Sequence, residues 1–212
     1  MGIEAAQKCG SRTIVAYAML LQNPQSILHQ PNLFQYHGDY SDNVNFENTI
    51  FKPRYTAKLQ NYQILACIVR HPIQRFLSAY TDKYMHHPHN YNNTNTTSID
   101  EFIEMYNNLP NITPHHSTLN YTNKIDLYTD IKYHITPLTN LYGTDNSFYT
   151  HIFNLSEMNK IKNLIENLSK TKLPDLHLNQ SLKHKSPTLQ HHHIQWINNT
   201  FEHDIDVYNK WM

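Results

Sequence analysis

The sequence is short of cysteine and glycine, and it has no excess of charge of either sign. Two cysteines in 212 residues, Cys9 and Cys67, exclude a disulfide framework and favour a reducing compartment. Four glycines and ten prolines are too few for a linker protein. Lys+Arg and Asp+Glu both number 17, so no positive field over the whole chain favours nucleic acid. We therefore expect a small partner and, for an anion, a local site.

Long apolar runs are also absent. No stretch approaches the roughly 20 apolar residues of a membrane span, and the N-terminus lacks the basic-then-apolar pattern of a signal peptide. We expect a soluble chain with a cytoplasmic location. Its length suits one nucleotide-binding domain over residues 1–212, and 39% hydrophobic residues suffice for a folded core.

The stretch from Ile64 to Tyr80 begins with an apolar run that stops abruptly. The run ends at Arg70-His71-Pro72, and proline is tolerated just inside a helix start. The pattern predicts a buried strand that leads into a helix. Arg70 then lies at the carboxyl end of a strand, where parallel α/β sheets bind ligands, and Ser78 lies within reach of the same edge. An arginine and a hydroxyl placed in this way favour a phosphate site.

A second strand-to-helix turn lies near the N-terminus. Ile3 to Gln7 is the expected strand, Ile14 to Leu21 is the expected helix, and Lys8-Cys9-Gly10-Ser11-Arg12-Thr13 joins them. Gly10 lets the backbone approach an anion, and the N–H groups at the helix start point toward it. The Lys8 ammonium and the hydroxyls of Ser11 and Thr13 complete a phosphate cage. Because the lysine precedes the glycine, the Walker A spacing is absent.

Together the two segments resemble the sulfotransferases that use 3'-phosphoadenosine-5'-phosphosulfate, in their carbohydrate sulfotransferase branch. The residues that carry the resemblance are Lys8-x-Gly10-Ser11-x-Thr13 and Arg70-x-Pro72-x-x-Arg75-Phe76-Leu77-Ser78-Ala79-Tyr80. The resemblance implies that the loop of Lys8, Cys9, Gly10, Ser11, Arg12 and Thr13 binds the 5'-phosphosulfate. It also implies that Arg70 and Ser78 bind the 3'-phosphate.

The resemblance extends more loosely along the chain. His134 to Tyr142 is similar to the family's His-x-x-Pro-Gln segment, and His177 to Ser181 is similar to its late Asn-x-Ser element. The chain departs from the family pattern at three positions. Gln7 stands where proline is usual, Arg12 where a small hydroxyl residue is common, and Leu138 where glutamine is common.

The family places its catalytic base in the segment between the two sites. His37 is the best candidate there, because it follows an expected short strand, Leu33 to Tyr36, and has a pKa near neutral. His29 and Glu47 are its rivals, and a solvated loop histidine is the alternative. Lys8 is the second expected catalytic residue, since it would stabilise the charge on the leaving phosphate.

Two histidine clusters suggest metal binding, but we expect no metal at either. The clusters are His86-His87-x-His89 and His191-His192-His193. Neighbouring histidines point in different directions, and no cysteine or carboxylate stands at ligand spacing in the sequence.

Five further elements are expected from the patterning. Ser98 to Glu101 is a capping box that opens a helix, and Phe148 to Leu155 is a strand. Ser156 caps a helix whose apolar residues are Ile161, Leu164, Ile165 and Leu168. A last helix runs from about Pro187 to Phe201, and a short one closes the chain.

The expected fold is a three-layer α/β domain of the P-loop type, with a central parallel sheet of about four to five strands flanked by helices. The resemblance implies metal-free transfer of a sulfuryl group to a hydroxyl acceptor on a glycan or glycolipid. A Golgi-type luminal domain separated from its anchor is then the alternative to a cytoplasmic protein. Two other functions stay open. One is a P-loop-type small-molecule or nucleotide kinase, and the other is a catalytically silent nucleotide-binding module, which the Arg12 and Leu138 departures permit.

Overall fold

The computed structural model of the chain describes residues 2–5, 9–22, 64–81, 98–108, 132, 134–176 and 187–212. The chain forms two compact units. The first contains Met1–Arg70, Thr144–Gln180 and Lys210–Met212, and the second contains His71–Gly143 and Ser181–Asn209. We describe each unit by itself, and the single domain expected over residues 1–212 stays a prediction.

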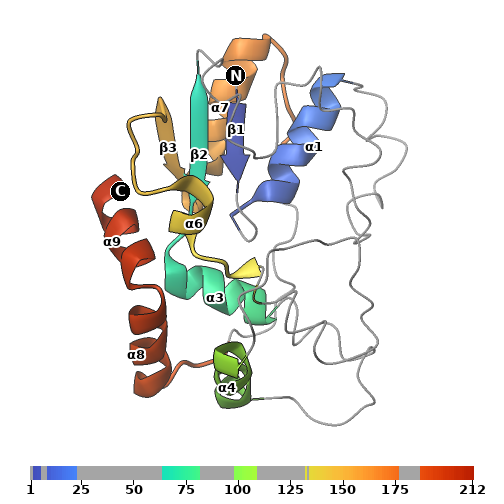
Figure 1. The fold of residues 1–212 in the computed structure, drawn as a ribbon. Helices are drawn as coiled ribbons and strands as arrows, with labels where there is room; N and C mark the ends of the chain where they lie inside the picture. The colour runs from blue at the N-terminus through green and yellow to red at the C-terminus, as the bar shows by residue number, and fades with distance from the viewer. Residues whose placement is uncertain are drawn as a thin grey trace, which may run out of the picture. The chain divides into compact units, whose positions relative to one another are not determined.

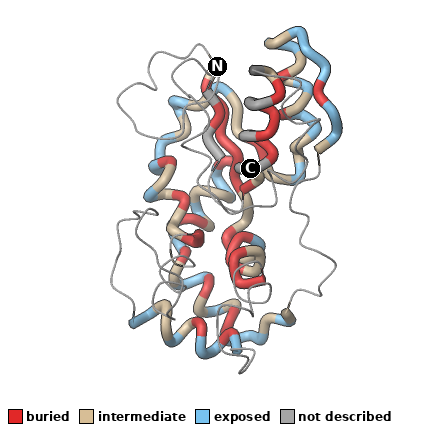
Figure 2. Tube along the Cα trace, turned by 90° about the vertical axis from the view of Figure 1, so that its right-hand side faces the viewer, coloured by how far each residue is buried: buried red, intermediate tan, exposed pale blue. Residues whose placement is uncertain are grey.

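A parallel sheet is the centre of the first unit. Its strands are β1 (Gly2–Ala5), β2 (Leu65–Val69) and β3 (His151–Asn154), in the order β1-β2-β3, as Figure 1 shows. All five residues of β2 are buried, which explains why this strand reads as an uninterrupted apolar run (Figure 2). The parallel sheet and the two strands expected around residues 64–69 and 148–155 are confirmed. The described residues contain three strands rather than four or five, and the expected strand Leu33 to Tyr36 lies outside them.

The helices of the first unit present one apolar face each. Helix α1 (Ser11–Gln22) buries Ile14, Tyr17 and Leu20, and α7 (Met158–Ser169) buries Ile161 and Ile165. This spacing of three or four residues is that of one helix face. Leu168, which the sequence pattern assigns to the buried face of α7, is instead 45% exposed, because it lies in the last turn of the helix.

The cap of α7 differs from the expectation. A 3₁₀ turn, η7 (Leu155–Glu157), precedes the helix and is itself capped by Asn154, whereas the N-cap of α7 is Glu157 rather than Ser156 and makes no side-chain capping hydrogen bond. The Asn154 side-chain oxygen accepts hydrogen bonds from the Ser156 N–H and hydroxyl, both at 3.0 Å. Glu157 accepts from the Asn154 N–H at 2.9 Å, which completes a capping box. The Ser156 prediction was wrong because two capping residue types stand two positions apart.

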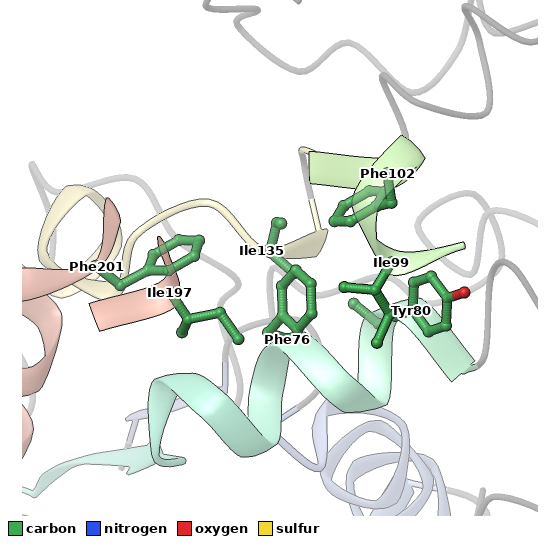
Figure 3. Close-up of a cluster of buried hydrophobic side chains, with 8 residues drawn as sticks. Phe76, Tyr80, Ile99, Phe102, Ile135, Ile197 and Phe201 are labelled. Carbon is green, nitrogen blue, oxygen red and sulfur yellow. The ribbon is translucent and has the colours of Figure 1, made fainter. Parts of the chain in front are cut away.

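The second unit is helical. Its elements are α3 (Pro72–Tyr80), α4 (Ile99–Asn108), α6 (Leu138–Tyr142), α8 (His191–Thr200) and most of α9 (Glu202–Trp211). Figure 3 shows the aromatic and aliphatic side chains at its core. The core residues are Phe76, Ala79, Tyr80, Ile99, Phe102, Ile135, Ile197 and Phe201. The Phe76 and Phe102 rings lie 5.4 Å apart between centroids, so α3 and α4 are joined by a direct aromatic contact.

The helix starts follow the sequence signals closely. Pro72 stands in the first turn of α3, and Ser98 and Glu101 form the expected capping box of α4, with Ser98 N–H donating to Glu101 at 2.9 Å. Among the described residues, none of the helices combines the length and apolar character that crossing a membrane requires.

Candidate functional site

The carboxyl edge of the parallel sheet brings together the Gly10 turn and Arg70, one residue group from each predicted phosphate segment, within the first unit. Strands β1, β2 and β3 are parallel, and the register pairs Ala5 with Ile68 and Val69 with Asn154. The turn at Gly10 follows β1, Arg70 follows β2, and the Asn154 cap ends β3. Parallel α/β sheets bind ligands at this edge, because loops and helix N-termini gather there. The edge is therefore the candidate site.

Gly10 is fixed at this edge by its backbone conformation and by its neighbours. Its φ of +81° lies in the left-handed region, which glycine adopts without strain. A Cβ at this position would lie 2.8 Å from Cδ1 of Leu155 and 3.3 Å from Sδ of Met158, so the turn packs against the start of α7. The Gly10 carbonyl accepts the Ile14 N–H at 3.2 Å, which begins α1. The turn is thus held in place from both sides.

The start of α1 supplies the backbone donors that the sequence predicts. The first N–H groups of an α-helix have no partner within the helix, and the helix dipole favours an anion beside them. Cys9 is fully buried before the turn, and Thr13, in the first turn of α1, is 5% exposed. Lys8 lies outside the described residues, as do the side chains of Ser11 and Arg12. Of the predicted phosphate cage, the structure therefore places the glycine turn, Thr13 and the helix start.

Arg70 lies directly after β2 and is half-buried, at the position expected for it. Because Arg70 directly follows β2 and belongs to the first unit, it lies at the same sheet edge as Gly10 and Asn154. Ser78 lies in the middle of α3, half-buried, and belongs to the second unit. The closing of Arg70 and Ser78 on one phosphate stays a prediction.

The sequence analysis did not single out His71, which caps α3. Its Nδ1 accepts the Ile73 N–H at 3.3 Å, so its Nε2 carries the proton of the neutral ring. The ring meets the edge of Tyr208, 5.1 Å away between centroids. Burial lowers the pKa of the His71 imidazole, which keeps the ring neutral and able to cap the helix.

The segment from His134 to Tyr142 is anchored by a buried aspartate on α9. Its helix, α6, begins after Pro137, which offers no side-chain cap. Asp204, 1% exposed, supplies the acceptors instead: its carboxylate accepts the N–H groups of Leu138 at 2.6 Å and Thr139 at 2.9 Å. Leu138 is buried; glutamine is common at this position in the family that the chain resembles.

Arg75, from the motif that follows β2, is also part of this anchor. Its guanidinium is 2% exposed and donates through Nη1 to the Thr136 carbonyl at 2.5 Å, 4.0 Å from the Asp204 carboxylate. Arg75 and Asp204 therefore hold the second unit together. Only Arg75 belongs to a recognisable motif. Asp204 lies 66 residues from Leu138, and no sequence signal links the two.

The candidates for the catalytic base lie outside the described residues. They are His37, His29 and Glu47. The segment from His177 to Ser181 and the cluster at His86, His87 and His89 also lie outside them. The described residues therefore form the scaffold of the predicted nucleotide site, and the acceptor side stays a prediction.

Comparisons with known proteins identify a family. The sequence model of a family described as the sulfotransferase family matches residues 5–210, almost the whole chain. No curated protein and no solved structure matches the chain.

Proposed function

The chain belongs to the sulfotransferase family, and from that premise we propose that it transfers a sulfuryl group from 3'-phosphoadenosine-5'-phosphosulfate to a hydroxyl group of a carbohydrate. The family match over residues 5–210 carries the proposal. The Gly10 turn supports it, because a rigid glycine turn followed by a helix start suits a phosphate group. The family match also favours sulfuryl transfer over the kinase alternative.

In the proposed reaction the acceptor oxygen attacks sulfur, and the bond between sulfur and the bridging phosphate oxygen breaks. The acceptor proton passes to the base, and 3',5'-adenosine bisphosphate leaves with the bonding electrons. As in phosphoryl transfer, the protein aligns the two oxygens and stabilises charge on the leaving group. The proposal assigns the alignment and the proton to His37.

The charge on the leaving phosphate is assigned to Lys8 and to the N–H groups at the start of α1. Because this charge grows only as the bond to sulfur breaks, these donors act mainly in the transition state. The half-buried Arg70, with Ser78, is assigned to the 3'-phosphate, which distinguishes the donor from nucleotides that lack this group. Neither assignment requires a metal ion.

The experiment that tests the proposal is an acceptor screen. The protein is incubated with donor labelled in the sulfuryl group and with a panel of glycans, glycolipids and small hydroxyl compounds. The proposal predicts labelled product with at least one carbohydrate. Binding of the donor without transfer to any acceptor would instead identify a silent nucleotide-binding module. No binding of the donor would contradict the proposal altogether.

A further inference from the structure

Three side chains that bind transition metals meet where α4 and α8 begin. Asp100 lies in the first turn of α4, and His192 and His193 lie in the first turn of α8. Asp100 Oδ1 lies 2.7 Å from His192 Nε2 and 3.0 Å from His193 Nε2. All three ligand atoms lie within 4.8 Å of one another. The sequence predicts no metal at His191-His192-His193, because no carboxylate stands nearby in the sequence; the fold supplies one from Asp100, 92 residues before His192.

We propose that Asp100, His192 and His193 bind one divalent transition-metal ion, such as Zn²⁺, with water completing the coordination. Two imidazole nitrogens and one carboxylate oxygen form a donor set that suits zinc and its neighbours rather than magnesium or calcium. Bonds of about 2.0–2.2 Å in a tetrahedral site place ligand atoms about 3.3 Å apart. The two separations from Asp100, 2.7 and 3.0 Å, therefore need to widen by about 0.3–0.6 Å, and the two Nε2 atoms, which lie within 4.8 Å of each other, need to settle at a similar distance.

The exposure of the three residues fits this use. His192 and Asp100 are 57% and 61% exposed, so both side chains can adjust and water can reach the ion. His193 is 5% exposed and supplies the fixed ligand.

Binding requires a proton to move within each imidazole ring. His193 Nδ1 accepts the Gln190 N–H at 3.1 Å, so Nε2 carries the proton and donates it to Asp100. For Nε2 to bind the ion, this proton must pass to Nδ1, which then faces the Gln190 N–H donor to donor, so the imidazole ring must shift away from Gln190 and water must take its place as the acceptor. One capping hydrogen bond is lost, which lowers the affinity about tenfold. His192 makes the same change of tautomer at the surface, where its Nδ1–H donates a hydrogen bond to water.

The bound ion would tie α4 to α8. Both helices contribute to the core of the second unit, α4 through Ile99 and Phe102 and α8 through Ile197. An ion that bridges their first turns holds these faces together. Its role is therefore stabilising, and it does not depend on the proposed function.

The test is Zn²⁺ binding to the full chain, compared with two variants and a control. The variants are Asp100→Asn and His192→Ala, both at exposed positions, and the control is His191→Ala, an exposed histidine one residue away. The chain has sixteen histidines, so the readout is the difference in calorimetric stoichiometry. The parent and His191→Ala should bind one Zn²⁺ more than either variant, or bind it about 100-fold more tightly.

A second measurement covers the case in which a variant folds poorly. Zn²⁺ at a hundred times its dissociation constant should raise the folded-to-unfolded ratio of the parent about 100-fold, which thermal unfolding detects. Co²⁺ should show the visible absorption of a four- or five-coordinate ion. Equal Zn²⁺ stoichiometry and affinity in all four proteins, or a parent that Zn²⁺ neither stabilises nor binds, would show that the three residues form only a hydrogen-bonded contact.

Discussion

At the scale of single residues, the backbone conformation of Gly10 disfavours a side chain, and a Cβ there would press on Leu155. Gly10→Ala should lower the free energy of unfolding by about 1–2 kcal/mol through its left-handed φ alone. The contact with Leu155 adds less, because the clashing Cδ1 is the end of a flexible side chain. Denaturant unfolding measures the change. Leu155→Ala in the same chain should restore part of the lost unfolding free energy. If the effects of the two substitutions on this free energy simply add, the contact between residues 10 and 155 is disproved.

Asp204 is the second residue whose removal has a predictable cost. Asp204→Ala removes the carboxylate beside the buried Arg75 and the acceptor for two N–H groups of α6. The free energy of unfolding should fall by about 3–5 kcal/mol, the usual result of breaking a buried charge pair. Asp206→Ala, at an exposed position of the same helix, should change it by less than about 0.5 kcal/mol. Comparable effects from the two substitutions would mean that Asp204 does not anchor α6.

At the scale of elements, the capping box of η7, the turn that leads into α7, makes stability depend on pH. The hydrogen bond from Lys160, and then that from the Asn154 N–H, lower the pKa of Glu157. A carboxyl group whose pKa is lower in the folded state than in the unfolded state stabilises the fold. The stabilisation is complete above the unfolded-state pKa, about 4.3 for glutamate, and is lost as the pH falls through the lower, folded-state pKa.

Glu157→Ala should therefore lower the free energy of unfolding by about 1 kcal/mol at neutral pH. Parent and variant should converge in acid, because the parent then loses the same contribution. Unfolding measured from pH 7 to pH 3 checks both statements. Asn163→Ala, at an exposed position of α7, serves as control and should show no such convergence. A difference between Glu157→Ala and parent that stays constant with pH would contradict the assignment.

The junction of β2 and α3 carries the prediction about the 3'-phosphate. If Arg70 binds this group, Arg70→Ala should weaken binding of 3',5'-adenosine bisphosphate by about 2–5 kcal/mol, because one partner of a charge pair is lost. The affinity for AMP, which lacks the 3'-phosphate, should hardly change. Calorimetry with both nucleotides measures this, and Lys172→Ala, a 93% exposed cation, is the control. An equal loss of affinity for both nucleotides would show that Arg70 does not bind the 3'-phosphate.

The elements that local patterns specify were predictable, and the contacts between distant residues were not. The apolar run before Arg70 predicted β2, Pro72 predicted the start of α3, and Ser98 with Glu101 predicted α4. Each of these signals acts within a few residues. The anchoring of α6 by Asp204 and the meeting of Asp100 with His192 depend on tertiary packing over 66 and 92 residues, and no local pattern encodes them.

At the scale of the whole molecule, the family match covers residues of both units. It runs from residue 5 to residue 210. Balanced charge confines any anion site to a local cluster, in keeping with the Gly10 turn and Arg70 at one sheet edge. Binding and turnover should therefore be separable. His37→Ala should keep nucleotide affinity and lose about 10² to 10⁴ in rate, whereas Glu47→Ala should keep the rate.

The most direct test of the central claim is the product of the donor during turnover. With the acceptor mixture and a chelator present, the parent should convert 3'-phosphoadenosine-5'-phosphosulfate to 3',5'-adenosine bisphosphate, with one labelled sulfuryl group in the acceptor for each nucleotide released. Chromatography of both products measures this ratio. Donor that stays intact with every acceptor, or acceptor that becomes phosphorylated from ATP instead, would contradict sulfuryl transfer by this protein.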